Sequence, residues 1–447
     1  MIVGLGASLA PLDIAVNVAL PAITRHFQLA LADVQWLVIC YVLVYGSLML
    51  ACGKLGDLFG HRRIFRIGLV ISAVGCAACA VAPDWPLFLW ARAGQGVGTA
   101  LALSCTPALA TSLYPESART RALAGFGMAM SLAAAVGPFL GGILVDLWGW
   151  PAVYWVRVPI ALVTLGLSGL LRSPRPDARP FDAIGAVLLA VCMSTLLLSL
   201  VLSQRREVAG VWALALFGAA LVLGWTYVAR ARRVPEPIIR PSLFVDPAFT
   251  VPNVMNVLAN LAGFAILLLT PYYLVNVLKL SALSTGLVLA LAFAGSLTGA
   301  PLSAWLVARI GQRPTAFAGV AMVGLGLLPL AFTGAATPVP VVAALLVLEG
   351  IGQGLLTVSY IDIVAATLPV RDRGVAGSLS QLTRTLGIVS GATVLTALQA
   401  QGAAGLMGIE GFLAGYRHAF MVAGGGLLLV LALSTLVPRA WLRHHAR

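Results

Sequence analysis

Charged residues are scarce in this chain, and their scarcity excludes a water-soluble globular protein. Only 10% of the 447 residues are Asp, Glu, Lys or Arg, whereas 60% are hydrophobic. A soluble domain has about 25% charged residues. So few charges cannot cover a soluble particle, but they can cover the rims of a protein whose middle faces lipid. The sequence therefore predicts an integral membrane protein.

Residues for enzyme chemistry are also missing or misplaced. The five histidines lie at the ends of apolar stretches, in loops or at the C-terminus, and the six cysteines show neither zinc-site spacing nor a disulfide framework. No Gly-Lys-Ser/Thr phosphate-binding loop occurs. We therefore expect no enzyme, no ATPase, no metal and no cofactor. The first stretch lacks a charged leader and contains Asp13, so we expect a retained span.

Long apolar stretches are abundant. A spanning helix needs about 20 mainly apolar residues. Fourteen stretches qualify, which predicts an all-α polytopic fold. They cover residues 2–24, 34–53, 64–82, 86–113, 122–146, 151–171, 183–203, 209–229, 248–276, 283–308, 314–334, 338–366, 374–398 and 416–437.

The basic residues alternate between the two sides of this arrangement. Of 28 Lys and Arg, 20 fall in one set of loops and the C-terminus, five fall in the opposite loops, and three lie inside spans. Cytoplasmic loops carry the excess of positive charge. We therefore expect both termini in the cytoplasm of a bacterial cell and the spans in its inner membrane. The net charge of +13 is then a topology signal and not a sign of nucleic-acid binding.

Two patterns recur in the chain. Gly53, Leu55, Asp57, Gly60 and Arg62 follow the second span, and Ala304, Leu306, Ala308, Gly311 and Arg313 follow the tenth. A weaker echo pairs Gly94-Gln95-Gly96 with Gly352-Gln353-Gly354. Both pair span n with span n+8, which predicts two parallel six-helix bundles, a transporter architecture with the site between the halves. The predicted parts are residues 1–171, an inserted helix pair with its linkers at 172–247, and 248–447.

Ionisable residues at membrane depth are functional candidates, because each costs about 2.5–3.5 kcal/mol there. Asp13 lies mid-span with Asn17 one turn on, and low dielectric favours its protonated form unless an arginine is near. We expect Asp13, Arg92 and Glu349 to serve proton coupling. An ion pair of Glu349 with Arg384 would instead be structural, and Asp146 is a candidate partner of Arg157. The candidate substrate-cavity residues are Asn17, Tyr41, Gln95, Arg157 and Arg384.

Two glycine-rich segments predict conformational devices. Gly53 to Arg63 is expected to form a tight cytoplasmic turn. Its Asp57, with Gly53, Gly60, Arg62 and Arg63, is interpreted as a latch for one conformation, the alternative being an ordinary solvated turn. Pro138 lies mid-span among Gly137, Gly141 and Gly142 and predicts a bend, which is either a gate or a static kink.

Together these residues resemble the major facilitator superfamily, and within it the fourteen-helix drug:proton antiporters of EmrB/QacA type. The resemblance covers nearly the whole chain and rests on Leu12 to Pro21, Gln35-Trp36 with Tyr41, Gly53 to Arg63, Arg92 to Gly98, Gly137-Pro138 with Gly141-Gly142, and Arg384 with Gly387. Ala133 and Arg157 depart from it, standing where that subfamily has glycine and asparagine.

The resemblance implies proton-driven export of hydrophobic or cationic compounds by alternating access. Asp13 would carry the proton, Arg92 would modulate it, Asp57 would be the latch and Gly137-Pro138 the gating bend. A dedicated exporter of one metabolite, antibiotic or lipid is the alternative, and a membrane enzyme or a non-transporting sensor is a third. Expected partners are small substrates, protons and lipid. Outer-membrane efflux partners are not demanded by the sequence.

Overall fold

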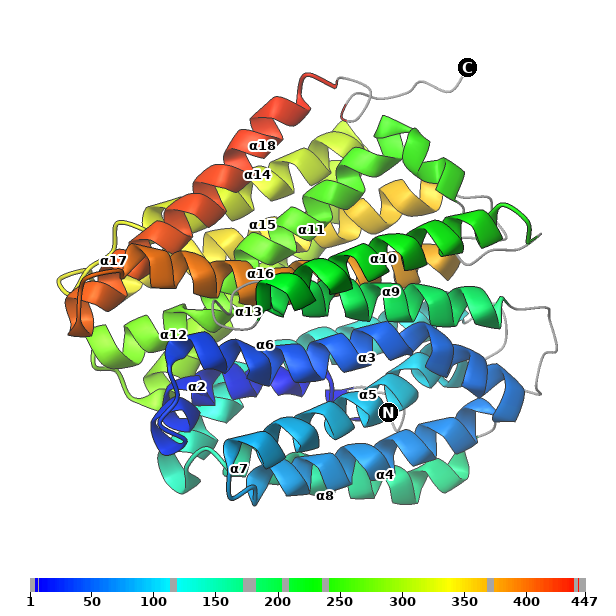
Figure 1. Ribbon diagram of the computed structural model, residues 1–447, viewed down its shortest axis with the longest axis horizontal. Coiled ribbons are helices and arrows are strands. Elements are labelled where there is room, and N and C mark those ends of the chain that lie inside the picture. The colour runs from blue at the N-terminus through cyan, green and yellow to red at the C-terminus, as the bar shows by residue number, and fades with distance from the viewer. Residues whose placement is uncertain are drawn as a thin grey trace. The chain divides into compact units, whose positions relative to one another are not determined.

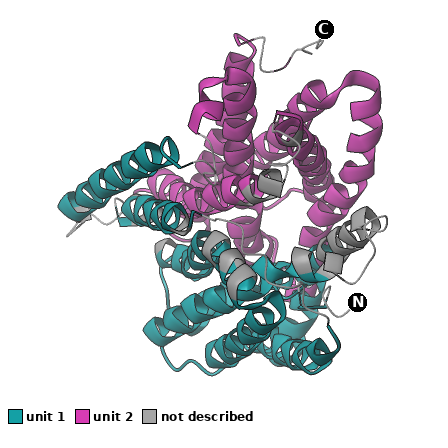
Figure 2. Cartoon of the chain, turned by 90° about the vertical axis from the view of Figure 1, so that its right-hand side faces the viewer, with its two compact units in different colours: residues 1–238 teal, residues 239–447 magenta. Residues whose placement is uncertain are grey.

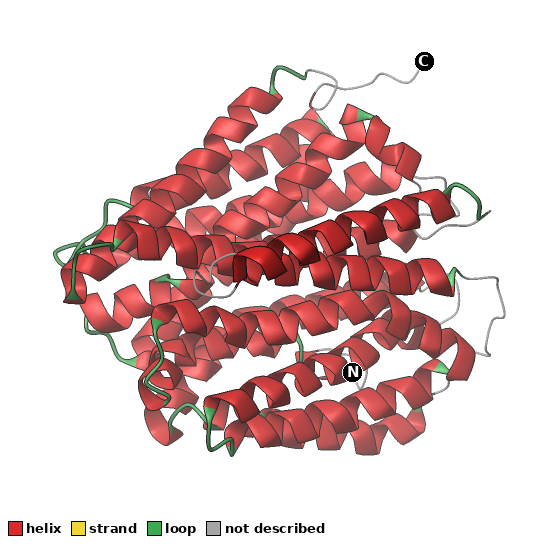
Figure 3. Cartoon of the chain, viewed as in Figure 1, coloured by secondary structure: helices red, strands yellow, loops and turns green. Residues whose placement is uncertain are grey.

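The computed structural model describes residues 5–6, 8–112, 119–171, 182–202, 209–234, 241–367, 374–437 and 441. Every regular element in these ranges is a helix (Figures 1 and 3). The chain divides into two compact units, residues 1–238 (unit 1) and 239–447 (unit 2), coloured separately in Figure 2.

Unit 1 is a bundle in which α5 packs on both α3 and α4, α2 packs on α6, and α4 also contacts α8. The pair α9 and α10 is attached to it through α3. Asp182, just before α9, accepts a 2.7 Å salt bridge from Arg230 near the end of α10. The elements are η1 (Pro11–Ile14), α2 (Ala15–His26), α3 (Leu31–Phe59), α4 (His61–Ala80), α5 (Trp85–Ser112), α6 (Arg119–Trp148), α7 (Ala152–Trp155), α8 (Arg157–Leu167), η3 (Ser168–Leu170), α9 (Ala183–Leu202) and α10 (Ala209–Ala231).

Unit 2 repeats part of this packing, because α15 packs on both α13 and α14, while α11 packs on α16 and α16 on α17. Two short segments in it, η5 and η7, are π-helical. The elements are η4 (Pro241–Val245), α11 (Pro247–Leu268), α12 (Thr270–Tyr272), η5 (Tyr273–Val277), α13 (Ala282–Ile310), α14 (Gln312–Leu330), α15 (Val339–Thr367), α16 (Gly374–Gly402), α17 (Gly408–Phe420), η7 (Met421–Gly425) and α18 (Gly426–Ser434).

The helices fit a multi-pass membrane protein. Each of the fourteen expected stretches coincides with one helix or with consecutive helical segments. Within the described residues, eight helices are long and apolar enough to cross a membrane. Large apolar side chains face outward on both units, as Trp225 (71% exposed) and Leu429 (61%) illustrate. The number of helices that cross, and the division into six, two and six, stay predictions.

The first expected span is not one continuous helix. A turn at Leu9 and Ala10 and the 3-10 segment η1 precede α2. Pro11 explains the break, because its ring lacks an amide hydrogen and clashes with the preceding turn of an α-helix. The expected loop from Gly53 to Arg63 is also wrong in extent. Helix α3 runs through to Phe59 and α4 begins at His61, so the turn is Gly60 alone, with φ of 88°.

Glycines define the internal repeat. Gly60 and Gly311 both have positive φ, 88° and 96°, and each separates two long helices. A Cβ placed on Gly98 would meet the Gly68 carbonyl oxygen at 2.8 Å, and one on Gly352 would meet the Gly319 carbonyl oxygen at 2.7 Å. Gly68 and Gly319 are 251 positions apart, as Gly60 and Gly311 are. The loop repeat seen in the sequence is therefore also a repeat of packing.

The alignment of Gly94-Gln95-Gly96 with Gly352-Gln353-Gly354, which the sequence suggests, is one helical turn away from the alignment that the packing shows. Gly75 packs against the backbone of Gln95, and Gly326, which is 251 positions later, packs against the backbone of Glu349. The pattern Gln95-Gly96-Val97-Gly98 thus corresponds to Glu349-Gly350-Ile351-Gly352 and not to the segment around Gln353. Glu349 occupies in unit 2 the place that Gln95 occupies in unit 1.

Candidate functional site

Asp13 sits in a nearly closed cluster of unit 1, where η1, α5 and α8 meet. Its side chain is 12% exposed. Arg92, on α5, donates from Nη1 to Oδ1 at 2.8 Å and from Nη2 to Oδ2 at 2.9 Å. This is the paired geometry in which a guanidinium fits a carboxylate best. Two residues that the sequence marked separately, 79 positions apart, therefore form one ion pair.

The guanidinium group of Arg92 is held in place by other groups besides Asp13. Its Nε donates to the Leu37 carbonyl oxygen at 3.2 Å, and Nη1 also donates to Gln95 Oε1 at 2.8 Å. The guanidinium carbon lies 4.5 Å from the centre of the Tyr41 ring. Gln95 Nε2 in turn donates to Asp13 Oδ1 at 3.3 Å. Helices α3 and α5 thus hold Arg92 in one orientation, and three of the predicted site residues surround it.

Arg157 is the second cation in the cluster. It stands at the start of α8, is 1% exposed and donates from Nη1 to Asp13 Oδ1. Among the described residues, its Nε and Nη2 have no hydrogen-bond partner of nitrogen or oxygen, and neither does the buried hydroxyl of Tyr154, whose ring centre is 5.3 Å from the guanidinium. The two guanidinium groups and one carboxylate sum to one positive charge. Sequence reasoning did not single out Tyr154, because an aromatic residue in an apolar stretch carries no distinguishing pattern.

Two further expectations for this region differ from the structure. Asp146 was the candidate partner of Arg157, but it lies on the exposed end of α6 while Arg157 pairs with Asp13. Proximity along the chain suggested the wrong acid, because the break at η1 brings Asp13 to the same place. Asn17 is buried, and its Nδ2 donates to the Ile14 carbonyl oxygen at 3.1 Å, within its own helix.

In unit 2, Glu349 is buried without an ion-pair partner among the described residues. It is 5% exposed, and Arg384, its expected partner, is exposed on α16 and forms no ion pair with it. Gln353, one turn along α15, is a hydrogen-bond neighbour of the carboxyl. A Cβ on Gly263 of α11 would lie 2.9 Å from Glu349 Oε1. The structural reading of Glu349 and Arg384 as an ionic link is therefore wrong.

A neutral polar network lies between α11, α15 and α16 of unit 2, and the sequence analysis missed it. Tyr360 donates to Asn253 Oδ1 at 2.7 Å, and Asn256 Nδ2 donates to Thr383 Oγ1 at 2.8 Å. The sequence does contain a pattern that predicts this network. Asn253, Asn256 and Asn260 recur at spacings of three and four, which places three amides on one face of an apolar helix.

The predicted latch is only partly within the described residues, whereas the glycines and the proline of the predicted bend are all described. Gly53 and Asp57 belong to the backbone of α3, but their side-chain surroundings lie outside the description. Arg62 and Arg63 stand in the first turn of α4, beside Gly60. Pro138 lies inside α6, which continues through it. Gly141 lets α6 approach α2 closely, since a Cβ there would meet the Ala15 carbonyl oxygen at 2.7 Å, and Gly142 is buried beside it.

Comparison with known proteins finds a matching family and several relatives. The family model described as Major Facilitator Superfamily matches residues 2–392 and 252–445. The chain is 31% identical over 396 residues to the multidrug resistance protein Stp of Mycobacterium tuberculosis (strain CDC 1551 / Oshkosh), covering 88% of this chain and 74% of Stp. It is 31% identical over 388 residues to the multidrug efflux pump LfrA of Mycolicibacterium smegmatis, covering 84% of this chain and 75% of LfrA.

A third relative is named for one substrate, riboflavin. Solved structures of other transporters share the fold. The riboflavin transporter RibZ of Clostridioides difficile is 26% identical over 407 residues, covering 90% of this chain and 88% of RibZ. A bacterial homologue of the human lysosomal transporter Spinster, in an inward-facing and unoccupied conformation, superposes with a TM-score of 0.72 at 16% identity, covering 100% of this chain and 98% of that one. An autoinhibited peptide transporter of the POT family gives 0.72 at 17% identity, with the same coverage.

Proposed function

Because this chain belongs to the Major Facilitator Superfamily, and is a transporter and not an enzyme, we propose that it exports small hydrophobic or cationic compounds across the bacterial inner membrane in exchange for protons. The observation that carries the proposal is a largely enclosed carboxylate, Asp13, shared by the buried Arg92 and Arg157. The multidrug efflux relatives support the substrate class. The orientation, both termini in the cytoplasm, and the finer placement among fourteen-helix antiporters rest on the sequence.

Protonation of Asp13 would change the stability of this cluster. A neutral carboxyl leaves two buried guanidinium groups without a counter-charge, and removing one partner of a buried pair costs about 3–5 kcal/mol. The arrangement around Asp13 would therefore open when a proton binds and reform when it leaves. Such a dependence couples proton movement to conformational change, as alternating access requires. No metal or other cofactor has a part in this scheme, because the proton is the coupling ion.

Glu349 is a second candidate for proton binding. It is buried and has no cation among the described residues to balance a negative charge. Gln95 stands at the equivalent place in unit 1 and donates to Asp13, so a carboxylate in this position of the repeat is specific to unit 2. Neutral glutamine at 349 should therefore fit the fold and remove only a proton site.

The test is substrate-driven proton flux in proteoliposomes with an imposed pH gradient. We expect cationic dyes to dissipate the gradient with wild type and not with Asp13→Asn, while Glu410→Gln, at an exposed position on α17, behaves as wild type. Equal flux in Asp13→Asn and wild type would move the coupling role to Glu349, tested next as Glu349→Gln. No flux from wild type with any compound of a broad dye and drug panel would reject the multidrug proposal.

A dedicated exporter of one compound is the second candidate, and two observations favour it. RibZ, a riboflavin transporter, matches over nine-tenths of this chain. The Asp13 cluster also carries one excess positive charge, and Arg157 Nε and Nη2 find no acceptor among the described residues, which suits an anionic or carbonyl-rich substrate better than a lipophilic cation. Flux with a single metabolite and with none of the cationic dyes would decide for this candidate.

A further inference from the structure

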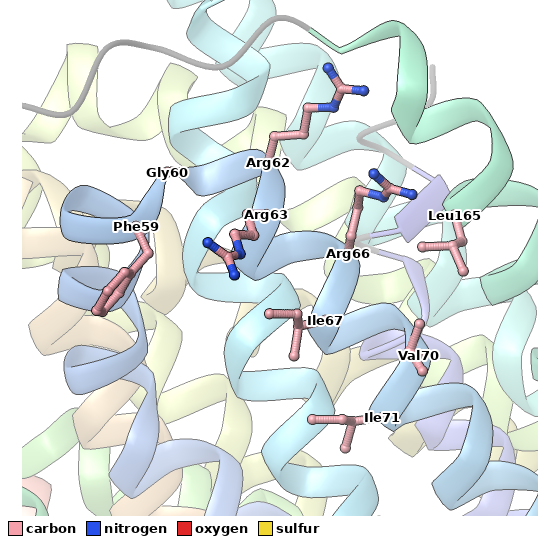
Figure 4. Close-up of a pocket in the computed structure, with 9 residues that line it drawn as sticks. All are labelled: Phe59, Gly60, Arg62, Arg63, Arg66, Ile67, Val70, Ile71 and Leu165. Carbon is pink, nitrogen blue, oxygen red and sulfur yellow. The ribbon is translucent and has the colours of Figure 1, made fainter.

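A pocket of about 720 Å³ opens beside the turn between α3 and α4, away from the Asp13 cluster (Figure 4). One part of its lining is basic and the rest is mostly apolar, and the wall opposite α4 includes a residue of α8. The lining residues are Phe59, Gly60, Arg62, Arg63, Arg66, Ile67, Val70, Ile71 and Leu165. We call this the Arg66 groove.

The basic part of the groove lacks a described counter-charge. Arg62, Arg63 and Arg66 stand within the first two turns of α4, where the helix dipole is itself positive and no acidic residue occupies the first turn. The ion pairs found among the described residues involve Arg92, Arg157 and Arg230 and none of these three. Three guanidinium groups at the positive end of a helix repel one another, so an anion bound here would be strongly favoured.

The apolar part of the groove continues onto the lipid-facing side of α4. Ile67 is 42% exposed and Val70 45%, and Val74, one turn beyond the pocket, is 63% exposed. Helix α4 is one of those apolar enough to cross the membrane. Its rise of 1.5 Å per residue places Val74 about 12 Å along the helix from Arg66. The guanidinium groups therefore lie at the end of a membrane-spanning stripe, at the depth where lipid headgroups begin.

We propose that the Arg66 groove binds an anionic glycerophospholipid, with its phosphate among the three arginines and one acyl chain along Ile67, Val70 and Ile71. A free phosphate would use the basic end but leave the exposed apolar stripe uncovered. A zwitterionic lipid would cover the stripe but bring no net charge to three cations. Basic clusters at the membrane end of a helix attract anionic headgroups in this way. The groove thus selects a lipid class, independently of what the protein exports.

The test uses the purified full-length protein in neutral detergent, titrated with phosphatidylglycerol or phosphatidylcholine and followed by native mass spectrometry. Arg66→Gln removes charge outside the proposed latch, and Val70→Trp fills the apolar part without changing charge. We expect each to weaken phosphatidylglycerol binding about tenfold, the change that ~1.4 kcal/mol produces. Arg233→Gln and Val211→Trp are matched controls, since both side chains are exposed on α10 or just after it and lie outside the groove and its apolar stripe.

Four results would overturn the proposal: equal binding of the two lipids, unchanged binding in both groove variants, an equal loss in Val211→Trp, or displacement of phosphatidylglycerol by millimolar inorganic phosphate. The last would indicate a free-anion site. Monodisperse elution and the unfolding temperature check that each variant folds. If Arg66→Gln fails that check, two other variants test the proposal. Val70→Trp should weaken phosphatidylglycerol binding, and Arg66→Lys, which retains the charge, should bind it as wild type does.

Discussion

At the scale of single residues, the two arginines on Asp13 are not equivalent. Within the part of the chain that the structure describes, Arg92 uses all three of its nitrogens, to Asp13, Gln95 and the Leu37 carbonyl, whereas Arg157 uses only Nη1, to Asp13. Arg157→Met leaves a neutral pair with every polar partner of Arg92 satisfied, so we expect a loss in unfolding free energy of under ~1 kcal/mol, or a gain. Arg92→Met takes the donor away from Gln95 Oε1 and from the Leu37 carbonyl oxygen, and we expect a loss of ~3 kcal/mol.

Denaturant unfolding of the detergent-purified variants measures this difference, with Arg233→Met at an exposed position as the baseline. Equal losses in the two variants would mean that charge alone, and not the hydrogen bonds of Arg92, holds the cluster. A larger loss in Arg157→Met would contradict the unequal roles directly.

The sequence identified Asp13, Arg92 and Arg157 because charges at membrane depth are few enough to stand out individually. It could not assign their partners, because the choice between Asp13 and Asp146 depends on the break in the chain at Pro11. Neutral polar residues were harder to find. Tyr154, Tyr360 and Thr383 become noticeable only when their hydroxyl groups are seen to be buried, since in the sequence they resemble the rest of an apolar stretch.

At the scale of helices, contact between α2 and α6 depends on Gly141. A Cβ at this position would meet the Ala15 carbonyl oxygen at 2.7 Å and the Ala15 Cβ at 2.9 Å, whereas one at Gly137 meets nothing closer than 3.6 Å. Overpacking a tight contact costs about 1–3 kcal/mol. We therefore expect Gly141→Ala to lose unfolding free energy in that range, and Gly137→Ala to be neutral or slightly stabilising because it also removes a flexible residue from a helix.

Thermal unfolding of both alanine variants beside wild type measures this contrast, and the two positions serve as each other's control because they lie one turn apart on the same face of α6. If Gly137→Ala is the more damaging, the two helices approach through a different pair of residues. If both leave transport and stability unchanged, the close approach at Gly141 has no part in holding α2 against α6.

Helix positions were predictable because a run of apolar residues at this length has one stable form in lipid. The places where a helix is interrupted or extended could not be predicted in this way. The π-helical turns at η5 and η7 have no sequence signature that the hydropathy pattern contains. Helix α3 was expected to end at Gly53 but continues to Phe59, because only Gly60 adopts positive φ. Register within the repeat likewise required the contacts of Gly75 and Gly326.

At the scale of the whole molecule, the repeat restricts how the chain can cross the membrane. The packing of α3, α4 and α5 recurs in α13, α14 and α15, with glycines at equivalent contacts. The sequence predicts that the repeat is parallel, and in a parallel repeat equivalent turns, such as Gly60 and Gly311, lie on the same side of the membrane. An even number of crossings must then separate them, and the count depends on whether α9 and α10 both cross.

Reporter fusions decide this count. With fourteen crossings, alkaline phosphatase should be active when fused after residue 205, between α9 and α10, and inactive after residue 175 or 238, while green fluorescent protein should show the reverse. The 20-to-5 division of basic residues supports that orientation. Inactive alkaline phosphatase at all three points would mean that α9 and α10 lie on one side, which would leave twelve crossings. Active alkaline phosphatase after residues 175 and 238 would mean that the protein has the opposite orientation, with the Arg66 groove in the outer leaflet.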